Sequence, residues 1–196
     1  MPKEIFRNKP TLAGHHVLLR PFAPEDLDAM GVALSDPEVL RLTGSVRTSE
    51  EASDASEELE ERERRWYESR EEQGDRLDLA VIDRQSDKCV GEVVLNEWSA
   101  LDRSCNFRIL LGPTGRNRGL GSVATRLILD YAFGATELNR IELDVYDSNP
   151  PAQHVYEAAG FIHEGRKREA FRFDNQPVDV VMMSILRSGW EAMSRS

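Results

Sequence analysis

The spacing of apolar residues changes once along the middle of the chain, and this change restricts the possible folds more than any other feature. Three runs, 77–83, 89–98 and 104–111, read as strands separated by turn residues, which predicts an antiparallel meander. Residues 112–114 (Gly-Pro-Thr) end the third strand. Apolar side chains then recur at helical spacing, which predicts a helix packed by one face against a sheet; they are Val123, Leu127, Ile128, Tyr131 and Ala132.

The rest of the chain supplies further strands and helices. The other predicted elements are a strand at 17–22, a helix at 24–34, a charged helix at 48–73, a strand at 141–146, a short helix at 152–160 closed by Gly160, and two late strands at 161–173 and 178–186 joined by a turn. The strand at 141–146 alternates, with Ile141, Leu143 and Val145 on one face and Glu142, Asp144 and Tyr146 on the other.

This order of elements predicts one α/β domain of the α+β-like kind. We expect a central mixed, mostly antiparallel sheet of about seven strands flanked by about four helices. The domain would cover residues 14–190, after an irregular N-terminal lead-in at 1–13 and before a C-terminal tail at 191–196. The charged helix at 48–73 is interpreted either as a solvated helix or as an acidic flap over a site for an amine.

Composition and charge exclude several classes of protein. The 196 residues carry a formal net charge of −10, which argues against a nucleic-acid partner and slightly favours a cationic substrate. No apolar run approaches the roughly 20 residues that cross a bilayer, so we expect no membrane association, and the charged start lacks the apolar segment of a signal peptide. Cys89 and Cys105 make no disulfide framework, which favours the reducing cytoplasm.

The segment Gly115–Ala124 (GRNRGLGSVA) has the composition of an anion site at the start of a helix. Glycines let backbone N–H groups approach a phosphate, and the free amides and positive dipole end of a helix N-terminus bind one. Arg116 and Arg118 could add charge-assisted hydrogen bonds, and Ser122 a hydroxyl. The segment alone does not identify the ligand to which the bound phosphate would belong.

Two of the possible phosphate-containing ligands, ATP and a dinucleotide, fit the sequence poorly. An ATP-binding P-loop needs a lysine in the loop, and no lysine lies between Lys88 and Lys167. The run from Gly119 to Ala124 matches a dinucleotide fingerprint, and Asp144 follows on a later strand. In that fingerprint, however, the strand leads directly into the first glycine, whereas residues 112–118 separate the strand from Gly119 here. An NAD(P)-dependent oxidoreductase is therefore disfavoured.

A second segment of the sequence points to a third possible ligand. Arg116-x-x-Gly119-x-Gly121 opens a helix, and further along comes Asn149-x-x-Ala152-x-x-x-Tyr156-x-x-x-Gly160-Phe161. Together these segments resemble the two signature regions of the GNAT superfamily of acyl-CoA-dependent N-acyltransferases. The resemblance covers roughly residues 14–187 and points more narrowly to the branch of ribosomal-protein-alanine and polyamine or antibiotic acetyltransferases.

The resemblance implies a site for acetyl-CoA as cosubstrate, without a metal. The strand before the loop would hold the pantetheine arm through its backbone at Arg108, Ile109 and Leu110, and Asn149 would bind the amide-rich arm. The implied pyrophosphate-binding residues are Arg116, Asn117, Arg118, Gly119, Leu120, Gly121 and Ser122.

The resemblance also implies catalytic residues. Tyr156 matches the tyrosine that protonates the leaving thiolate, and a phenol with a pKa of about 10 is a reasonable acid for this step. The branch often has a serine at the position of Ala152. Alanine cannot donate a proton, so Ala152 cannot take the acid role of that serine. Asp144, in Leu143-Asp144-Val145, matches an acid proposed as general base, with Glu92 and Glu97 as alternatives. Candidate acceptor-site residues are Glu97, Trp98 and Glu92.

We therefore expect an N-acetyltransferase that acts by direct attack of a primary amine, either a protein N-terminus or a small molecule. Two alternatives remain open: transfer of succinyl or another acyl group, and a regulatory module that binds coenzyme A without chemistry. Arg20 and Arg108 are arginines that could favour a succinyl donor. Homodimers are common in the branch that this chain resembles, so a homodimer is also expected.

Overall fold

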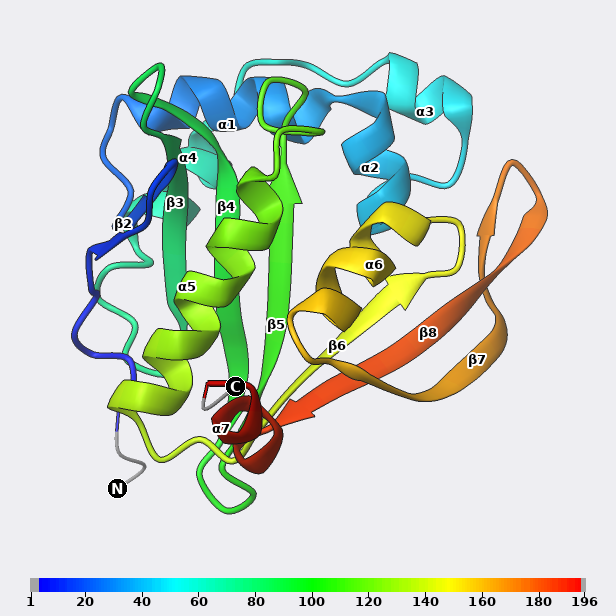
Figure 1. The fold of residues 1–196 in the computed structure, drawn as a ribbon. Coiled ribbons are helices and arrows are strands. Elements are labelled where there is room, and N and C mark those ends of the chain that lie inside the picture. The colour runs from blue at the N-terminus through cyan, green and yellow to red at the C-terminus, as the bar shows by residue number, and fades with distance from the viewer. Residues whose placement is uncertain (1–3, 195–196) are drawn as a thin grey trace.

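A computed structural model describes residues 4–194 and shows one mixed sheet with helices on both faces (Figure 1). The strand order is β1-β2-β3-β4-β5-β6-β8-β7, and each neighbouring pair is antiparallel except β5 and β6, which are parallel. The strands are β1 (Leu12–Ala13), β2 (Val17–Arg20), β3 (Leu77–Asp83), β4 (Lys88–Ser99), β5 (Ser104–Leu111), β6 (Arg140–Tyr146), β7 (Ile162–Phe173) and β8 (Gln176–Leu186). The predicted fold class is confirmed.

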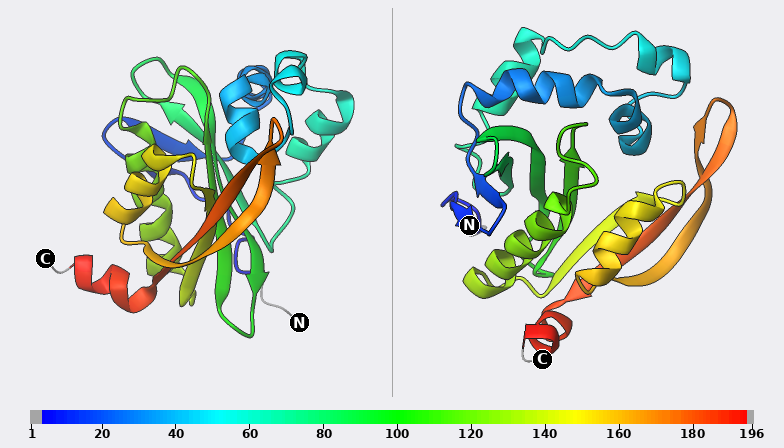
Figure 2. Two further views of the ribbon diagram at one scale, coloured as in Figure 1. Left: turned by 90° about the vertical axis from the view of Figure 1, so that its right-hand side faces the viewer. Right: turned by 45° about the horizontal axis from the view of Figure 1, so that its top comes forward.

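The helices form two layers. They are α1 (Asp26–Ser35), α2 (Pro37–Thr43), α3 (Ser49–Ser53), α4 (Glu61–Glu68), α5 (Leu120–Ala135), α6 (Pro150–Ala158) and α7 (Arg187–Ser194). Figure 2 shows the sheet edge-on, with α5 and α6 on one side and α1–α4 on the other. Because each face of the central strands is covered, β3 is buried along its whole length.

Two hydrophobic clusters fill the two layers. The larger one joins the sheet to α5 and α6 and includes Phe107, Ile128, Leu143 and Tyr156. The smaller one joins the other face of the sheet to α1, α2 and α4 through side chains such as Met30. The strand β6 separates its residues as its alternation predicts, with Leu143 buried and Asp144 exposed.

The predicted helix at 48–73 is wrong, because the segment forms α3 and α4 with an irregular stretch between them. The N-cap of α3 is Thr48, whose side chain accepts a hydrogen bond from the backbone N–H of Glu51. The irregular stretch crosses α1 at Gly31, where a Cβ atom would overlap the carbonyl oxygen of Glu57. This extended crossing lets Leu59 reach the smaller core, whereas one straight helix would carry the chain past α1.

The helix α2 is absent from the elements predicted from the sequence, which include none between the helix at 24–34 and the helix at 48–73. Asp36 accepts a hydrogen bond from the backbone N–H of Val39 at 3.0 Å, and Pro37 occupies the first turn. An aspartate N-cap followed by proline is a helix start signal. The predicted end of the helix at 24–34 is therefore close to the boundary between α1 and α2.

The ends of the described chain are more ordered than the predicted lead-in and tail. Within 1–13, Phe6 is fully buried in the larger core and β1 pairs with β2. At the other end, α7 extends across the predicted tail boundary at 190 as far as Ser194. Arg187 holds α7 in place by donating to the carbonyl oxygens of Phe133, Thr136 and Leu138. Residues 195–196 of the predicted tail lie outside the described residues.

Candidate active site

The central feature of the site is the divergence of β5 from β6. The two parallel strands pair only at Ser104–Arg140, Cys105–Ile141 and Asn106–Glu142. Beyond this point, β5 continues to pair with β4 as far as Leu111, and β6 continues to pair with β8 as far as Tyr146. The facing backbone edges from Phe107 and Leu143 onward are therefore not paired with each other, and an extended ligand can add to such an edge as another strand would.

The loop after β5 leads to the N-terminus of α5 at the end of this divergence. Asn117 and Gly119 have left-handed backbones, with φ of 58° and 73°, and Gly119 is the N-cap residue. A Cβ atom at Gly119 would meet no other atom within 4 Å, so the space beside it is open. The first amides of α5 have no partners within the helix, so they are available to an anionic ligand at this end.

Both loop arginines form ion pairs with carboxylates of the protein. Arg116 contacts Asp36 at 2.8 Å and also Glu38, both at the start of α2. Arg118 contacts Asp83 at the end of β3 at 2.9 Å and lowers the pKa of that carboxyl by hydrogen bonding. The sequence grouped these two arginines as phosphate ligands, whereas the fold gives each a different partner.

Asn149 follows β6 and caps α6. Its Oδ1 accepts a hydrogen bond from the backbone N–H of Ala152 at 3.2 Å. No described residue accepts a hydrogen bond from its Nδ2, so this donor can reach a ligand. Asn149 therefore lies at the end of β6, while the loop lies at the end of β5, on the two sides of the divergence.

Tyr156 enters the larger core from α6. Its ring lies 6.0 Å from that of Phe107 in an edge-to-face arrangement and 5.8 Å from that of Phe161. Burial raises the pKa of the phenol, so the hydroxyl keeps its proton at neutral pH. Phe107 belongs to the part of β5 that has left β6, so Tyr156 packs beside the unpaired edge.

Asp144 lies on the exposed face of β6. Its carboxylate accepts a hydrogen bond from Lys167 Nζ of β7 at 2.6 Å, and half of its side chain (51%) is exposed. The sequence gave no sign of Lys167 as a partner, because the two residues are joined only through β8, which pairs with both strands.

Glu92 lies on β4 beneath α4 and is nearly inaccessible, with 6% of its surface exposed. Tyr67 of α4 donates a hydrogen bond to Glu92 Oε2 at 3.2 Å. Burial, reinforced by the charge of Asp78, raises the pKa of the Glu92 carboxyl to about 7. The sequence analysis did not name Tyr67, which is buried, whereas its neighbour Trp66 is exposed.

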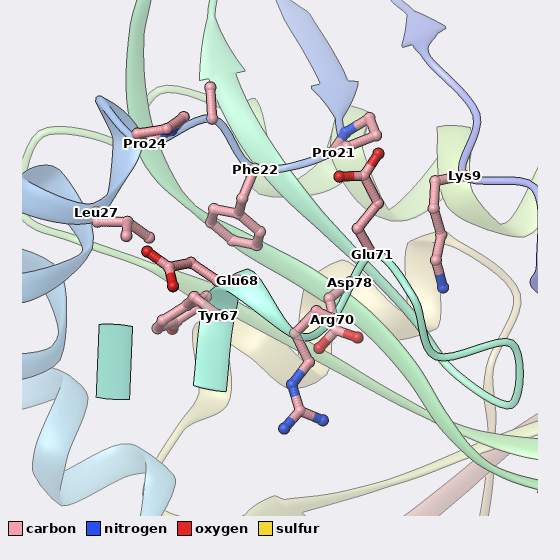
Figure 3. A pocket seen from close by; sticks show the side chains of 11 residues that line it. Lys9, Pro21, Phe22, Pro24, Leu27, Tyr67, Glu68, Arg70, Glu71 and Asp78 are labelled. Carbon is pink, nitrogen blue, oxygen red and sulfur yellow. The ribbon is translucent and has the colours of Figure 1, made fainter. Parts of the chain in front are cut away.

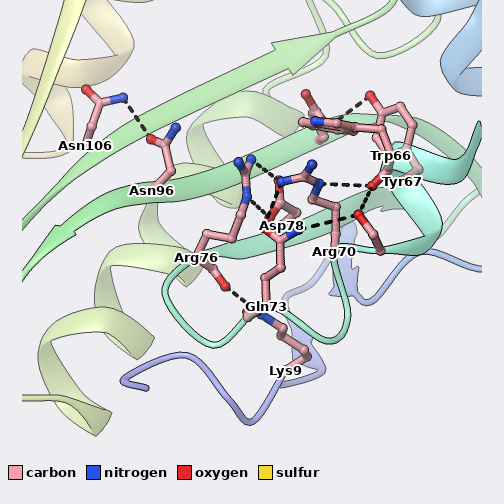
Figure 4. Close-up of polar contacts among 11 residues, drawn as sticks. Lys9, Trp66, Tyr67, Arg70, Gln73, Arg76, Asp78, Asn96 and Asn106 are labelled. Carbon is pink, nitrogen blue, oxygen red and sulfur yellow. Dashed lines mark hydrogen bonds and ion pairs between the residues drawn. The ribbon is translucent and has the colours of Figure 1, made fainter. Parts of the chain in front are cut away.

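The charges of Asp78 and Arg76 act on Glu92, and both residues belong to a polar network that Figure 4 shows. Arg76 donates two hydrogen bonds to Asp78, at 2.6 and 2.7 Å, and Arg70 stacks over the Trp66 ring at 3.7 Å. Beside this network lies a pocket of about 180 Å³, between the loop before α1 and the end of α4 (Figure 3). Tyr67 and Asp78 line the pocket, so Tyr67 separates it from Glu92.

Glu97 and Trp98 are not gathered with Asp144. A bulge interrupts β4 after Asn96, and Glu97 adopts a left-handed backbone with φ of 55°. Trp98 packs against the larger core, on the α5 side of the sheet. Its buried Nε1 has no hydrogen-bond partner among the described residues.

A second pocket, of about 190 Å³, lies beside the end of β6. Tyr146 stacks on Phe171 of β7 with ring centres 4.7 Å apart, and Arg41 of α2 also lines the pocket. Ser49 of α3 donates two hydrogen bonds to Asp174 in the β7–β8 turn, at 2.5 and 2.8 Å. Sequence reasoning missed this pocket because its walls come from segments far apart in the chain.

Comparison with known proteins identifies the family to which this chain belongs. The family described as "Acetyltransferase (GNAT) domain" matches residues 16–162. The chain belongs to the GNAT acetyltransferases. It is therefore an acyl-CoA-dependent N-acetyltransferase, and the expected acetyl-CoA cosubstrate is confirmed at the level of the family.

Some relatives of this GNAT protein are named spermidine N(1)-acetyltransferases, and another is named a putative ribosomal N-acetyltransferase. This GNAT protein is 34% identical over 108 residues to spermidine N(1)-acetyltransferase of Vibrio cholerae, across 55% of this chain and 62% of that protein, under two thirds of its length. It is 28% identical over 176 residues to the Escherichia coli K12 protein of the same name, across 89% and 88% of the two chains.

A solved structure of a GNAT enzyme has the same fold. The crystal structure of the Vibrio cholerae spermidine N-acetyltransferase in complex with CoA and spermine superposes with a TM-score of 0.76. It is 27% identical in sequence, and the match covers 90% of this chain and 98% of that one.

The geometry of the candidate site in this chain is compatible with coenzyme A. The open space beside Gly119 and the amides of α5 suit a pyrophosphate, and the unpaired edge of β5 suits the amide-rich arm. Within residues 4–194, no group of three or more His, Cys, Asp or Glu side chains is arranged to hold a metal ion. Across the same residues, no helix has the length and apolar character needed to cross a bilayer.

Proposed function

We propose that this GNAT protein acetylates a primary amine of a polyamine such as spermidine. The observation that carries the proposal is the divergence of β5 from β6, with the anion-binding helix terminus at one strand end and Asn149 at the other. The names of the relatives support a polyamine, and the net charge of −10 favours a cationic acceptor.

Donor binding would depend on the main chain. The backbone amides from Asn117 to Ser122 hold the pyrophosphate, and the free edge of β5 at Arg108, Ile109 and Leu110 pairs with the pantetheine arm. Asn149 adds a side-chain donor through Nδ2. Because these contacts are mostly to backbone, substitutions that preserve the loop conformation affect donor binding little.

Tyr156 would act as the general acid. The amine nitrogen attacks the thioester carbonyl carbon, the C–S bond breaks, and the Tyr156 hydroxyl gives its proton to the departing thiolate sulfur. Burial disfavours the charged form of both groups, so it raises the pKa of the phenol and also makes a buried thiolate bind a proton more readily than it would in water. Solvent then returns a proton to Tyr156.

Asp144 would accept the proton that the amine loses, directly or through a water molecule. Its carboxylate is on the exposed face of β6, whereas Glu92 is covered by Tyr67. We therefore expect Asp144→Asn to lower kcat/KM for the acceptor, and Glu92→Gln to leave kcat/KM at pH 8 close to that of the wild-type protein. The opposite ranking of the two variants would transfer the role to Glu92.

The second pocket would hold the acceptor beyond its reacting nitrogen. It adjoins Tyr146, which shares the exposed face of β6 with Asp144. The test is an acetylation assay that offers spermidine, spermine, an aminoglycoside and a peptide with a free N-terminus, each with acetyl-CoA and with succinyl-CoA. We expect the highest kcat/KM for spermidine with acetyl-CoA. Binding of acetyl-CoA without turnover of any amine would instead identify a coenzyme A-binding module.

A cytoplasmic homodimer is also part of the proposal. Cys89 and Cys105 are both buried free thiols, which is compatible with a reducing compartment. Ile162, Leu186 and Met193 are exposed apolar side chains on β7, β8 and α7, a surface that suits a second copy. Light scattering after size-exclusion chromatography would distinguish a dimer from a monomer.

A further inference from the structure

Arg116 joins the loop before α5 to the start of α2. Its Nη2 lies 2.8 Å from Asp36 Oδ1, and its Nη1 donates to Glu38. The Arg116 side chain is 23% exposed and that of Asp36 15%, so the Arg116–Asp36 pair is largely shielded from solvent. Both arms of the guanidinium are thus committed to carboxylates of one short helix.

Asp36 determines where α2 begins. The Oδ1 atom that contacts Arg116 also accepts the backbone N–H of Val39 at 3.0 Å, and Asp36 is at once the C-cap of α1 and the N-cap of α2. Gly112, in the same loop as Arg116, lies against α1, because a Cβ atom there would be 2.9 Å from Ala33 Cβ. The loop therefore contacts the junction between these two helices.

The opposite end of α2 contacts the strand that carries Asp144. Gly44, the C-cap of α2, is left-handed with φ of 71°, and a Cβ atom there would overlap the hydroxyl of Tyr146. Arg41 in the last turn of α2 lines the second pocket with Tyr146 and Phe171. Thus α2 reaches from the loop, at its first residues, to the second pocket, at its last.

We propose that Arg116 is a positioning residue for the amine acceptor: its pairing with Asp36 and Glu38 fixes α2, and thereby the wall of the second pocket. The inference rests on the proposed function, since it takes the second pocket as the acceptor subsite. It also assigns Arg116 a different role from the phosphate ligand that the sequence motif implies.

Electrostatics favour this assignment. A pyrophosphate that approached the Arg116 guanidinium would also approach the negative charges of Asp36 and Glu38, which repel it. The amides at the start of α5 bind an anion without that repulsion. Arg116 thus connects the donor loop to the acceptor wall through the protein's own carboxylates.

The experiment measures KM for acetyl-CoA and for spermidine separately in the full chain. Arg116→Gln should raise the spermidine KM by roughly five- to tenfold, the effect of losing a shielded charged hydrogen-bond pair. Its acetyl-CoA KM should change by less than about twofold, since backbone amides carry donor binding. Asp36→Asn combined with Glu38→Gln should reproduce this pattern, because asparagine still caps α2 while the charges are lost.

The charge-neutral double variant makes the test decisive. If Arg116 were a phosphate ligand, Arg116→Gln would raise the acetyl-CoA KM at least as much as the spermidine KM. The double variant would then free the guanidinium and lower the acetyl-CoA KM. Either of these results would overturn the proposal. Thermal unfolding of each variant identifies a folding defect, and Arg116→Lys, which keeps the charge, should recover part of the spermidine affinity.

A control ion pair, more exposed than that of Arg116, lies on the same helical layer. Arg64 of α4 pairs with Asp28 of α1 at 2.9 Å, away from the loop and from α2. Arg64→Gln should change neither the acetyl-CoA KM nor the spermidine KM. If it raised the spermidine KM, the loss of another ion pair in this layer would have the same effect as Arg116→Gln, and this result would contradict the proposal. Failure of the wild-type protein to bind acetyl-CoA in calorimetry, or to acetylate spermidine, would instead reject the proposed function itself.

Discussion

Tyr67 covers Glu92, donating a hydrogen bond to Oε2 across 3.2 Å beneath α4. The carboxyl is thereby held in the interior of the sheet face that α1 and α4 cover, with Asp78 as a further negative charge nearby. A carboxyl in such a position binds its proton more tightly than in water. The stability of the protein should therefore depend on pH through this group.

Glu92→Gln should stabilise the protein in alkaline solution. The folded carboxyl has a pKa of about 7 against an ordinary value of 4.5. Between pH 4.5 and about 7, the folded chain therefore binds more protons than the unfolded chain. The stability that this group contributes is present at low pH and is lost as the pH rises toward 7. The variant should gain about 2 to 3 kcal/mol in unfolding free energy over wild type at pH 8, and little at pH 4.

Urea unfolding of both proteins at pH 4, 6 and 8 measures this difference. Glu97→Gln is the control for the loss of one carboxylate, since Glu97 lies on the same strand but is exposed. A constant difference between Glu92→Gln and wild type across the pH range would contradict the raised pKa.

Tyr156→Phe should remove the proton donor while preserving the core. Phenylalanine keeps the ring contacts with Phe107 and Phe161. We expect kcat to fall by roughly 100-fold, the usual contribution of general acid catalysis, and the acetyl-CoA Kd to stay within about twofold. Steady-state kinetics and calorimetry test the two parts. Tyr131→Phe is the control, and an equal loss of binding and turnover in Tyr156→Phe would remove the acid role.

Gly44→Ala should destabilise the protein by more than about 1 kcal/mol, because alanine resists a left-handed backbone and its Cβ would overlap Tyr146. Gly134→Ala in α5 is the matched comparison: a Cβ atom there meets nothing within 4 Å. That substitution should instead stabilise the helix, by up to about 1 kcal/mol. Thermal denaturation of both variants distinguishes the two effects, and equal melting temperatures would refute the close packing of α2 on Tyr146.

Thr125→Val should stabilise the protein by about 1 kcal/mol, because it replaces a buried hydroxyl that has no hydrogen-bond partner among the described residues. Thr125 is fully buried in α5, and valine has nearly the same shape. Thr43→Val should give no such gain, since Thr43 Oγ1 donates to the carbonyl oxygen of Val39 at 2.8 Å. Chemical denaturation of the two variants compares them; a destabilised Thr125→Val would point to a bound water at this hydroxyl.

Local patterns in the sequence determined much of the fold. The predicted bounds of β3 and β5 agree with the structure, since turn residues flank each strand in the sequence. The left-handed Gly119 and Gly160 lie at the two helix ends where glycine was expected. The signature segments at Arg116–Gly121 and Asn149–Phe161 identified the family without any structure, because each depends on residues close together in the chain.

Contacts between distant residues decided the rest. Whether residues 48–73 form one helix depended on their crossing of α1 at Gly31, and periodicity carries no information about that contact. The ion pair of Arg116 with Asp36 joins positions 80 residues apart, and that of Asp144 with Lys167 bridges two strands through a third. The sequence supplied the chemical groups, but only the tertiary structure determined which charges meet, because ion pairs form by proximity in space.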